Sequence, residues 1–284
     1  MGKDRQLHTA IEATDETRYR HIIEESRFSW LALWRAANKE DPEKLLAKSL
    51  IKTFGTARRI FRLLTMRNSY TRETYVFDTF HKWASSICRL VDLSVLVRNQ
   101  EAVPSDRTCL FVANHLSPLD IPVLIKAIPI RAAFVANDVL SRIPVFSFWM
   151  QKSGTVFIDQ EHQETSSRAL REMVERLKQG RNLILFPEGY IHQDEGVAQF
   201  KRGGIVAARI AGVPIVPVCL YGTQYAFQPG SLAMRKQSKI LVEFGNPIET
   251  KSLLQQESKQ LPQKLEYYFR ETRLRLEQEF GTTG

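Results

Sequence analysis

The sequence lacks any run of about 18 or more uncharged apolar residues, the length that a helix needs to cross a membrane. A spanning helix is therefore not expected, and any membrane contact would be peripheral. Cysteine is also scarce, and its three positions are far apart among apolar residues: Cys88, Cys109 and Cys219. An odd, scattered set is typical of buried thiols in a reducing compartment and argues against a disulfide framework or a metal site. The charged residues 1–5 do not resemble a secretory signal.

Acidic residues are in the minority, since 31 aspartates and glutamates stand against 40 lysines and arginines. The formal net charge is +9 and the sequence pI is about 9.5, which favours an anionic partner or surface. Nucleic acid is not the expected partner, because the chain has no zinc-finger, basic-zipper or single-strand stacking signature. An anionic membrane surface fits better, because of where the positive charge lies.

Acidic residues are absent from residues 44–72, where lysines and arginines alternate with apolar residues. The apolar positions recur mostly at spacings of three and four, which predicts an amphipathic helix or helix pair with one basic face. Helices of this kind lie in the interface of anionic membranes, where each cation contributes on the order of 1 kcal/mol. We therefore expect residues 1–100 to form a helical region that holds the protein peripherally on the cytoplasmic side of a membrane.

Residues 44–72 also have two other interpretations. In one, the basic face is solvated while the apolar stripe packs on the main domain. In the other, the stretch binds nucleic acid, and binding would then be salt-dependent and seen with DNA but not with anionic vesicles. Residues 74–97 are predicted to form a second amphipathic helical region, which either packs on the main domain or dips into lipid.

From about residue 101 the pattern changes to strands that alternate with helices. Strands are predicted at residues 109–114, 132–136, 154–159, 182–187, 214–221 and 239–244. Helices are predicted at residues 118–127, 138–151, 163–179, 201–211 and 257–279. This alternation is typical of an α/β domain with a mainly parallel sheet flanked by helices, here spanning residues 101–284. Ligands of such domains gather at the carboxyl ends of the strands.

A histidine and a carboxylate mark the end of the first of these strands. The apolar residues 109–113 predict a buried strand, and His115 follows at its carboxyl end. Ser117 has the chemistry of a helix N-cap, Pro118 is favoured at the first helical position, and Asp120 comes three residues after the cap. The bend at this point can bring the carboxylate to the imidazole. The carboxylate would then fix the tautomer of a general base and stabilise the imidazolium that forms.

The less specific interpretation is that Asp120 only completes a capping box and that His115 is an ordinary loop histidine. A second strand end favours the functional one. The apolar run 183–186 ends in Pro187, Glu188 and Gly189, a sharp turn that carries another carboxylate. Glu188 is predicted to hold a hydroxyl-bearing substrate while neighbouring backbone amides stabilise a developing oxyanion. The alternative for Glu188 is a turn residue in a salt bridge.

Together with a Phe-Lys-Arg-Gly-Gly segment at residues 200–204, these blocks resemble the glycerolipid acyltransferase family of the lysophosphatidic acid acyltransferase (PlsC) type. That family has Asn-His-x-x-x-x-Asp, Gly-x-x-Phe-Ile, Phe-Pro-Glu-Gly and Val-Pro-Ile-x-Pro-Val blocks in this order. Here the four blocks are Asn114–Asp120, Gly154–Gln160, Phe186–Gly189 and Val213–Val218. The resemblance covers about residues 105–250.

The resemblance implies transfer of a fatty acyl group from a thioester, on coenzyme A or acyl carrier protein, to the hydroxyl of a lysophospholipid-like acceptor. It implies that His115 deprotonates the hydroxyl and that Asp120 supports His115. Neither a metal nor a cofactor beyond the acyl-CoA or acyl-ACP co-substrate is expected, because a thioester is already activated. A Ser117 acyl-enzyme is disfavoured, because a capping hydroxyl is occupied. The residues expected to bind substrate at the matching positions are Asn114, Glu188, Gly189, Lys201, Gln160 and Asn137.

The chain departs from the family where the acceptor's phosphate is usually bound. Gln160 and Ile191 stand where the second and third blocks commonly have arginine, and Asn137 replaces a common lysine. Neutral side chains do not replace the charged fork of arginine. Either Lys201 supplies compensating charge, or the acceptor differs and is a lysophospholipid with a larger head group, an acylated amino acid or a glycolipid precursor. The polar residues 192–195 are expected to be a solvated loop.

A different class of function also remains open. The chain could be a non-catalytic, membrane-associated lipid-binding or scaffold protein that retains the acyltransferase fold. The replaced arginines favour this alternative, whereas the intact His115, Asp120 and Glu188 oppose it.

Overall fold

The structure is a computed structural model that describes residues 59–142, 146–159, 163–191, 199–227, 237–253 and 255–281. Most of the basic stretch 44–72, together with Gln160 and the polar residues 192–195, lies outside these ranges.

One seven-stranded sheet organises the described residues, with strand order β1-β7-β6-β2-β5-β3-β4. The strands are β1 (Ser94–Arg98), β2 (Leu110–Ala113), β3 (Ala132–Asn137), β4 (Val156–Ile158), β5 (Asn182–Leu185), β6 (Ile215–Tyr221) and β7 (Lys239–Phe244). All neighbouring strands pair in parallel except β6 and β7, which are antiparallel. The predicted mainly parallel α/β sheet is confirmed.

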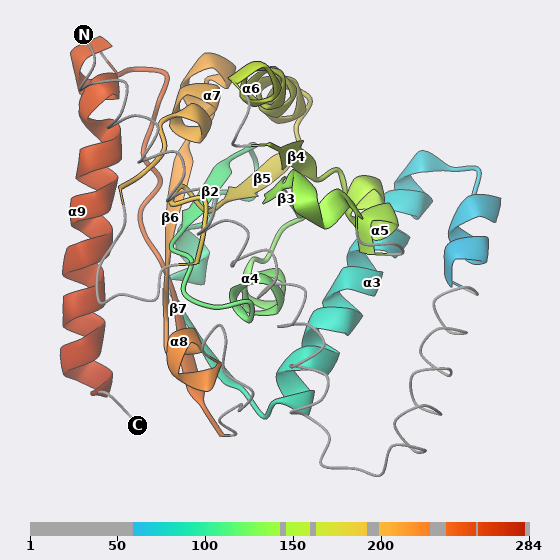
Figure 1. The fold of residues 1–284 in the computed structure, drawn as a ribbon, viewed down its shortest axis with the longest axis horizontal. Coiled ribbons are helices and arrows are strands. Elements are labelled where there is room, and N and C mark those ends of the chain that lie inside the picture. Colours follow the sequence, from blue (N-terminus) through green and yellow to red (C-terminus); the bar gives the residue numbers. More distant parts are fainter. Residues whose placement is uncertain are drawn as a thin grey trace, which may run out of the picture.

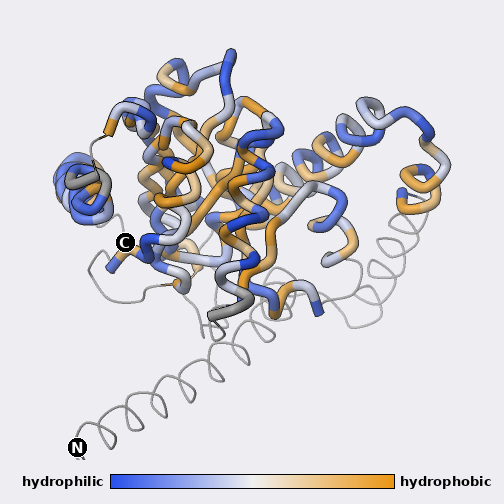
Figure 2. The backbone as a smooth tube through the Cα atoms, turned by 90° about the horizontal axis from the view of Figure 1, so that it is seen from above, coloured by the Kyte–Doolittle hydropathy of each residue, from blue (hydrophilic) through white to orange (hydrophobic). Residues whose placement is uncertain are grey.

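Helices cover both faces of the sheet (Figure 1). The α-helices are α3 (Ser69–Leu90), α4 (Asp120–Ala127), α5 (Phe146–Ser153), α6 (Gln163–Lys178), α7 (Gly203–Ala211), α8 (Thr223–Ala226) and α9 (Gln255–Phe280), and 3-10 turns span Gln100–Ala102 and Asp138–Arg142. Hydrophobic residues gather between these layers (Figure 2).

Alternation along β2 divides the core in two, because successive side chains of a strand point to opposite faces. Phe111 and Ala113 pack in a cluster with residues of α4 and the end of α3. Leu110 and Val112 pack in a second cluster with residues of α6, α7 and α9. All four side chains are fully buried, which explains why this strand reads as a continuous apolar run.

The helix predicted at residues 74–97 is wrong at its carboxyl end. α3 ends at Leu90, Asp92 takes a positive φ of 52°, and β1 follows as the edge strand. β1 pairs in parallel with β7, from Ser94 opposite Lys239 to Arg98 opposite Glu243. Helical periodicity in the sequence was therefore overridden by hydrogen bonding to a strand about 145 residues away, because tertiary pairing outweighs weak local preference.

The predicted helix 138–151 is also divided. Residues 138–142 form a 3-10 turn and α5 begins at Phe146. Pro144 stands between them in the sequence, and the residue before a proline is disfavoured in the helical conformation. The other predicted elements occur within about three residues of their expected bounds.

The three cysteines are buried and free of disulfide bonds, as their apolar surroundings predicted. Burial raises the pKa of Cys109 and of Cys219 to about 12, and it also raises the pKa of Cys88. The thiolate is the nucleophilic form of cysteine, so none of these side chains is suited to attack a substrate at neutral pH. Within the part of the chain that the structure describes, no helix has the length and apolar character for crossing a bilayer.

Candidate active site

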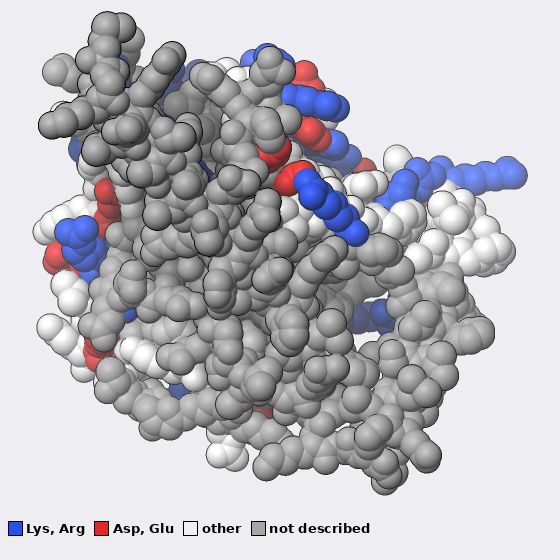
Figure 3. Space-filling model, viewed as in Figure 1, with Lys and Arg blue, Asp and Glu red and all other residues white. Residues whose placement is uncertain are grey.

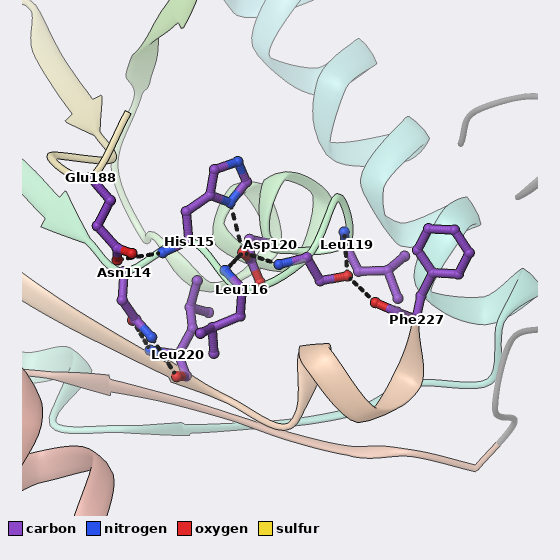
Figure 4. Close-up of polar contacts among 9 residues, drawn as sticks. Asn114, His115, Leu116, Leu119, Asp120, Glu188, Leu220 and Phe227 are labelled. Carbon is purple, nitrogen blue, oxygen red and sulfur yellow. Dashed lines mark hydrogen bonds and ion pairs between the residues drawn. The ribbon is translucent and has the colours of Figure 1, made fainter. Parts of the chain in front are cut away.

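The candidate site lies at the carboxyl ends of β2, β5 and β6, which are neighbours in the sheet. Asn114 follows β2 and is 4% exposed. Its side-chain Nδ2 donates to the Leu220 carbonyl at 3.0 Å, and its Oδ1 accepts from the Leu220 N–H at 2.7 Å (Figure 4). The amide therefore acts as an extra rung between β2 and β6. Its Oδ1 and Nδ2 are thus both hydrogen-bonded to the main chain of Leu220.

His115 and Asp120 come together as the sequence predicted. His115 Nδ1 lies 2.8 Å from Asp120 Oδ2, and Asp120 is fully buried. The same oxygen accepts the N–H groups of Leu116 at 2.6 Å and Ser117 at 2.8 Å. An ionised carboxylate can only accept hydrogen bonds, so we assign the imidazole hydrogen to Nδ1. Nε2 is then the nitrogen that can take up a proton.

The His115 imidazole is stacked on an aromatic ring. Its centroid lies 3.9 Å from that of Phe186, with 11° between the ring planes, and Phe134 stacks in turn on Phe186 at 6.2 Å. The His115 side chain is 14% exposed, and the nitrogen not bonded to Asp120 points away from the carboxylate (Figure 4). The ring is thus held on one face by Phe186 and at Nδ1 by Asp120, while its other nitrogen points away from the carboxylate.

Ser117 does not have the simple helix-cap role that its sequence position predicted. α4 begins at Asp120, after a turn in which the Asp120 N–H donates to the Ser117 carbonyl at 3.0 Å. The Ser117 hydroxyl donates to the Phe227 carbonyl at 2.8 Å and accepts the Leu119 N–H at 3.3 Å. The carboxylate of Asp120 reaches back over the turn and satisfies backbone donors that a capping hydroxyl would otherwise serve. One carboxylate therefore combines the capping and the histidine-orienting roles.

Glu188 points at the main chain of His115. Its Oε1 accepts the His115 N–H at 3.0 Å, and the residue is 1% exposed. It lies on a turn closed by a hydrogen bond from the Gly189 N–H to the Phe186 carbonyl at 3.1 Å. Gly189 has a φ of +82°, which glycine adopts without the strain of a side chain. This turn brings Glu188 to the site, but as a partner of the protein backbone.

The remaining predicted site residues are placed less centrally. The Lys201 N–H donates to the Pro187 carbonyl at 2.8 Å, so its exposed side chain starts beside the β5 end. The preceding residue, Phe200, is held by its N–H to Glu266 Oε1 of α9 at 2.7 Å. Asn137 ends β3, two strands from β2, and its Oδ1 accepts the Val139 N–H at 3.0 Å. Gln160 lies outside the described residues.

Phe186 belongs to a motif that the sequence analysis recognised, but no role was predicted for its side chain. The available signal was an aromatic residue at a strand end immediately before a Pro-Glu-Gly turn. Among the described His, Cys, Asp and Glu side chains, no group of three or more is arranged to hold a metal ion. Chemically, the arrangement provides an oriented imidazole with a buried carboxylate behind it, which suits proton abstraction from a hydroxyl.

The chain is similar in sequence to known acyltransferases. Residues 94–221 match the family model described as Acyltransferase. The chain is 30% identical over 153 residues to 1-acyl-sn-glycerol-3-phosphate acyltransferase BAT2, chloroplastic, of Brassica napus, covering 54% of this chain and 44% of that protein. It is 28% identical over 174 residues to the 1-acyl-sn-glycerol-3-phosphate acyltransferase of Escherichia coli strain K12, covering 60% of this chain and 69% of that protein.

A solved structure also matches. The crystal structure of the 1-acyl-sn-glycerophosphate acyltransferase PlsC from Thermotoga maritima superposes with a TM-score of 0.69 at 28% sequence identity, covering 79% of this chain and 89% of that chain. The chain spans about half the length of the curated chloroplast relatives that it matches.

Proposed function

We propose that the protein transfers a fatty acyl group from an acyl thioester to the hydroxyl of a lysophospholipid-like acceptor, a proposal supported by the match of residues 94–221 to the acyltransferase family model and by the similar acyltransferases. The observation that carries the proposal is the 2.8 Å contact between His115 Nδ1 and the buried Asp120 carboxylate at the end of β2. The donor is acyl-CoA or acyl-ACP, and it is the only co-substrate needed.

In the proposed mechanism, His115 Nε2 takes the proton of the acceptor hydroxyl as its oxygen attacks the thioester carbonyl. The positive charge that forms on the imidazole is stabilised by Asp120, which keeps Nδ1–H oriented toward Oδ2. Collapse of the tetrahedral intermediate breaks the carbon–sulfur bond, and the imidazolium returns its proton to the leaving thiolate. The products are an ester and a free thiol, so atoms and charge balance without any further reagent.

A covalent acyl-enzyme is not part of this proposal. The Ser117 hydroxyl is fully buried and engaged with the Phe227 carbonyl, and the three cysteines are buried with raised pKa values. Direct attack by the acceptor is therefore favoured over a two-step transfer through a protein nucleophile.

The acceptor is proposed to differ from lysophosphatidic acid, unless Lys201 supplies the charge that the replaced residues lack. Gln160, Ile191 and Asn137 replace the cationic residues that the resemblance implies for a phosphate monoester, and a neutral side chain cannot form an ion pair with phosphate. Lysophospholipids with larger head groups, acylated amino acids and glycolipid precursors are the candidate acceptors.

The test is an acceptor panel. Purified protein is incubated with radiolabelled acyl-CoA or acyl-ACP and with lysophosphatidic acid or each candidate acceptor, and ester formation is followed. We expect transfer, with a higher kcat/KM for at least one larger acceptor than for lysophosphatidic acid. A preference for lysophosphatidic acid would refute the acceptor proposal alone. Specific lipid binding with no transfer to any acceptor would instead support a non-catalytic scaffold.

The described end of the basic stretch supports contact with an anionic membrane surface. Residues 59–65 are helical, and one face packs by Leu63 beside Val76 of α3 and Trp149 of α5. Phe61 and Leu64 remain 69% and 65% exposed. Arginines flank them, and Lys and Arg side chains project beside uncharged surface at this end of the molecule (Figures 1 and 3). Exposed apolar side chains among cations suit a lipid interface.

We expect a Phe61→Ser, Leu64→Ser double variant to bind vesicles containing phosphatidylglycerol at least about tenfold more weakly than the parent protein, because each side chain loses apolar burial in lipid. Co-sedimentation at low and high salt measures this partition. Leu96→Ser and Ile210→Ser are matched controls, since these residues are also exposed, at 49% and 48%, but lie on β1 and α7. Equal loss in the control variants, or no loss in the double variant, would count against this surface.

A further inference from the structure

We propose that the β5 turn, residues Phe186–Gly189, supports the histidine base, and that Glu188 and Phe186 are positioning residues for His115. This inference rests on the proposed function for its kinetic consequence. It assigns Glu188 a different role from the substrate contact that its motif predicted.

The contact of Glu188 links its buried carboxylate to the main chain of the proposed base. The residue is 1% exposed, and Oε1 accepts the N–H of His115 itself at 3.0 Å. A buried ionised group is costly unless it is hydrogen-bonded, and a charge-assisted bond is about twice as strong as a neutral one. Figure 4 shows Glu188 and Asp120 on opposite sides of His115. One carboxylate thus holds the backbone of His115, and the other holds its ring.

Phe186 restricts the imidazole in a different direction. Its ring lies nearly parallel to that of His115, with 11° between the planes and 3.9 Å between the centroids. Rotation of the imidazole out of this stack would break the Nδ1 contact to Asp120. An aromatic face also attracts a cation, so the stack favours the imidazolium that forms during proton abstraction. Phe134 supports Phe186 from behind at 6.2 Å.

The two contacts come from one hydrogen-bonded turn. The Gly189 N–H closes the turn on the Phe186 carbonyl at 3.1 Å, and the Lys201 N–H ties Pro187 to the next segment at 2.8 Å. The conformation of the turn therefore sets both the stacking of Phe186 on His115 and the acceptance of the His115 N–H by Glu188. This conformation requires the positive φ of Gly189. A displacement of the turn would move the base as a whole.

The kinetic test separates positioning from substrate contact in the full-length protein. We expect Glu188→Leu to lower kcat about 100-fold with the KM for the acceptor unchanged, because a misplaced base costs turnover and not acceptor affinity. Glu188→Gln keeps an oxygen that can accept the His115 N–H, and should lose no more than about tenfold in kcat. Phe186→Leu should lower kcat, and Phe186→Tyr, which keeps the ring face, should restore most of it.

Glu243→Gln is the matched control, because Glu243 is also buried, at 6% exposure, but pairs with Arg275 on the α9 side of the sheet. It should leave both kinetic constants within about twofold of the parent values, since it contacts no group of the proposed site. A rise in the acceptor KM of Glu188→Leu or Glu188→Gln with unchanged kcat would overturn the positioning role and return Glu188 to the acceptor.

A second measurement does not depend on turnover. In isotope-labelled protein, Glu188→Leu should move the backbone amide proton resonance of His115 upfield, because the bond to a carboxylate is lost. Phe186→Leu should move the His115 ring-proton resonance downfield, because the ring current of the stacked face is lost. His115→Ala identifies both signals. If both resonances move but the parent protein transfers no acyl group, the proposed function is refuted and the support role stands. If the resonances do not move, the support role itself is refuted.

Discussion

His115→Ala is expected to lower kcat/KM for acyl transfer on the order of 10³-fold while the protein remains folded. The loss follows because the acceptor hydroxyl would have no positioned base to take its proton. The fold should persist because the ring is at the edge of the core, with 14% of the side chain exposed, and because Asp120 Oδ2 would still accept the Leu116 and Ser117 N–H groups. Initial rates with labelled acyl-CoA, together with thermal unfolding, measure the two effects.

His81→Ala is the matched control for this variant. His81 lies on α3 and packs on Phe77, with 4.4 Å between ring centroids, away from the strand ends. Its removal should leave kcat/KM within about twofold of the parent value, as expected of a site without shared partners. Turnover by His115→Ala at a rate near that of His81→Ala would defeat the proposed mechanism.

Asp120→Asn is expected to lower kcat by about 10²- to 10⁴-fold, with only a moderate loss of stability. The neutral amide cannot stabilise the imidazolium as the carboxylate does. The amide oxygen can still accept the Leu116 and Ser117 N–H groups. The remaining cost comes from a buried NH₂ group beside the histidine, which we place at about 1–3 kcal/mol.

Asp120→Ala should in addition destabilise the fold by about 3–5 kcal/mol, because the backbone donors of the turn lose their acceptor in a fully buried position. Urea unfolding of both variants measures the difference. Asp106→Asn serves as the control, since Asp106 is exposed on the loop before β2 and should change stability by less than about 0.5 kcal/mol. If Asp120→Asn keeps full turnover, the carboxylate is only a capping group.

Much of the sheet was predictable because its central strands are buried on both faces. Such strands read as short apolar runs ended by Pro, Gly or a polar residue, so β2, β5, β6 and β7 were found near their true bounds. β1 was missed because it is an edge strand whose mixed pattern follows a long helix, and its conformation depends on β7. The division between a 1–100 region and a 101–284 domain stays a prediction.

The contacts of the candidate site were likewise predictable only in part. The contact between His115 and Asp120 joins residues only five apart, so the strand end, the turn and the proline between them made it predictable. The direction of Glu188 was not predictable, because the motif shows that a carboxylate is present but not which group it faces. The amide of Asn114 and the hydroxyl of Ser117 were likewise engaged by distant carbonyls.

The amino-acid order by itself determined the local chemistry: which strands are buried, where each one ends, and that an imidazole and a carboxylate share one turn. Only the tertiary structure decided that Glu188 supports His115 across 73 residues, and that Asn114 and Ser117 serve the backbone across 106 and 110 residues. The physical reason is the separation along the sequence of the residues that make each contact. Local hydrogen bonds follow from backbone geometry over a few residues, whereas contacts between distant segments depend on strand order, which is set by burial of the whole core.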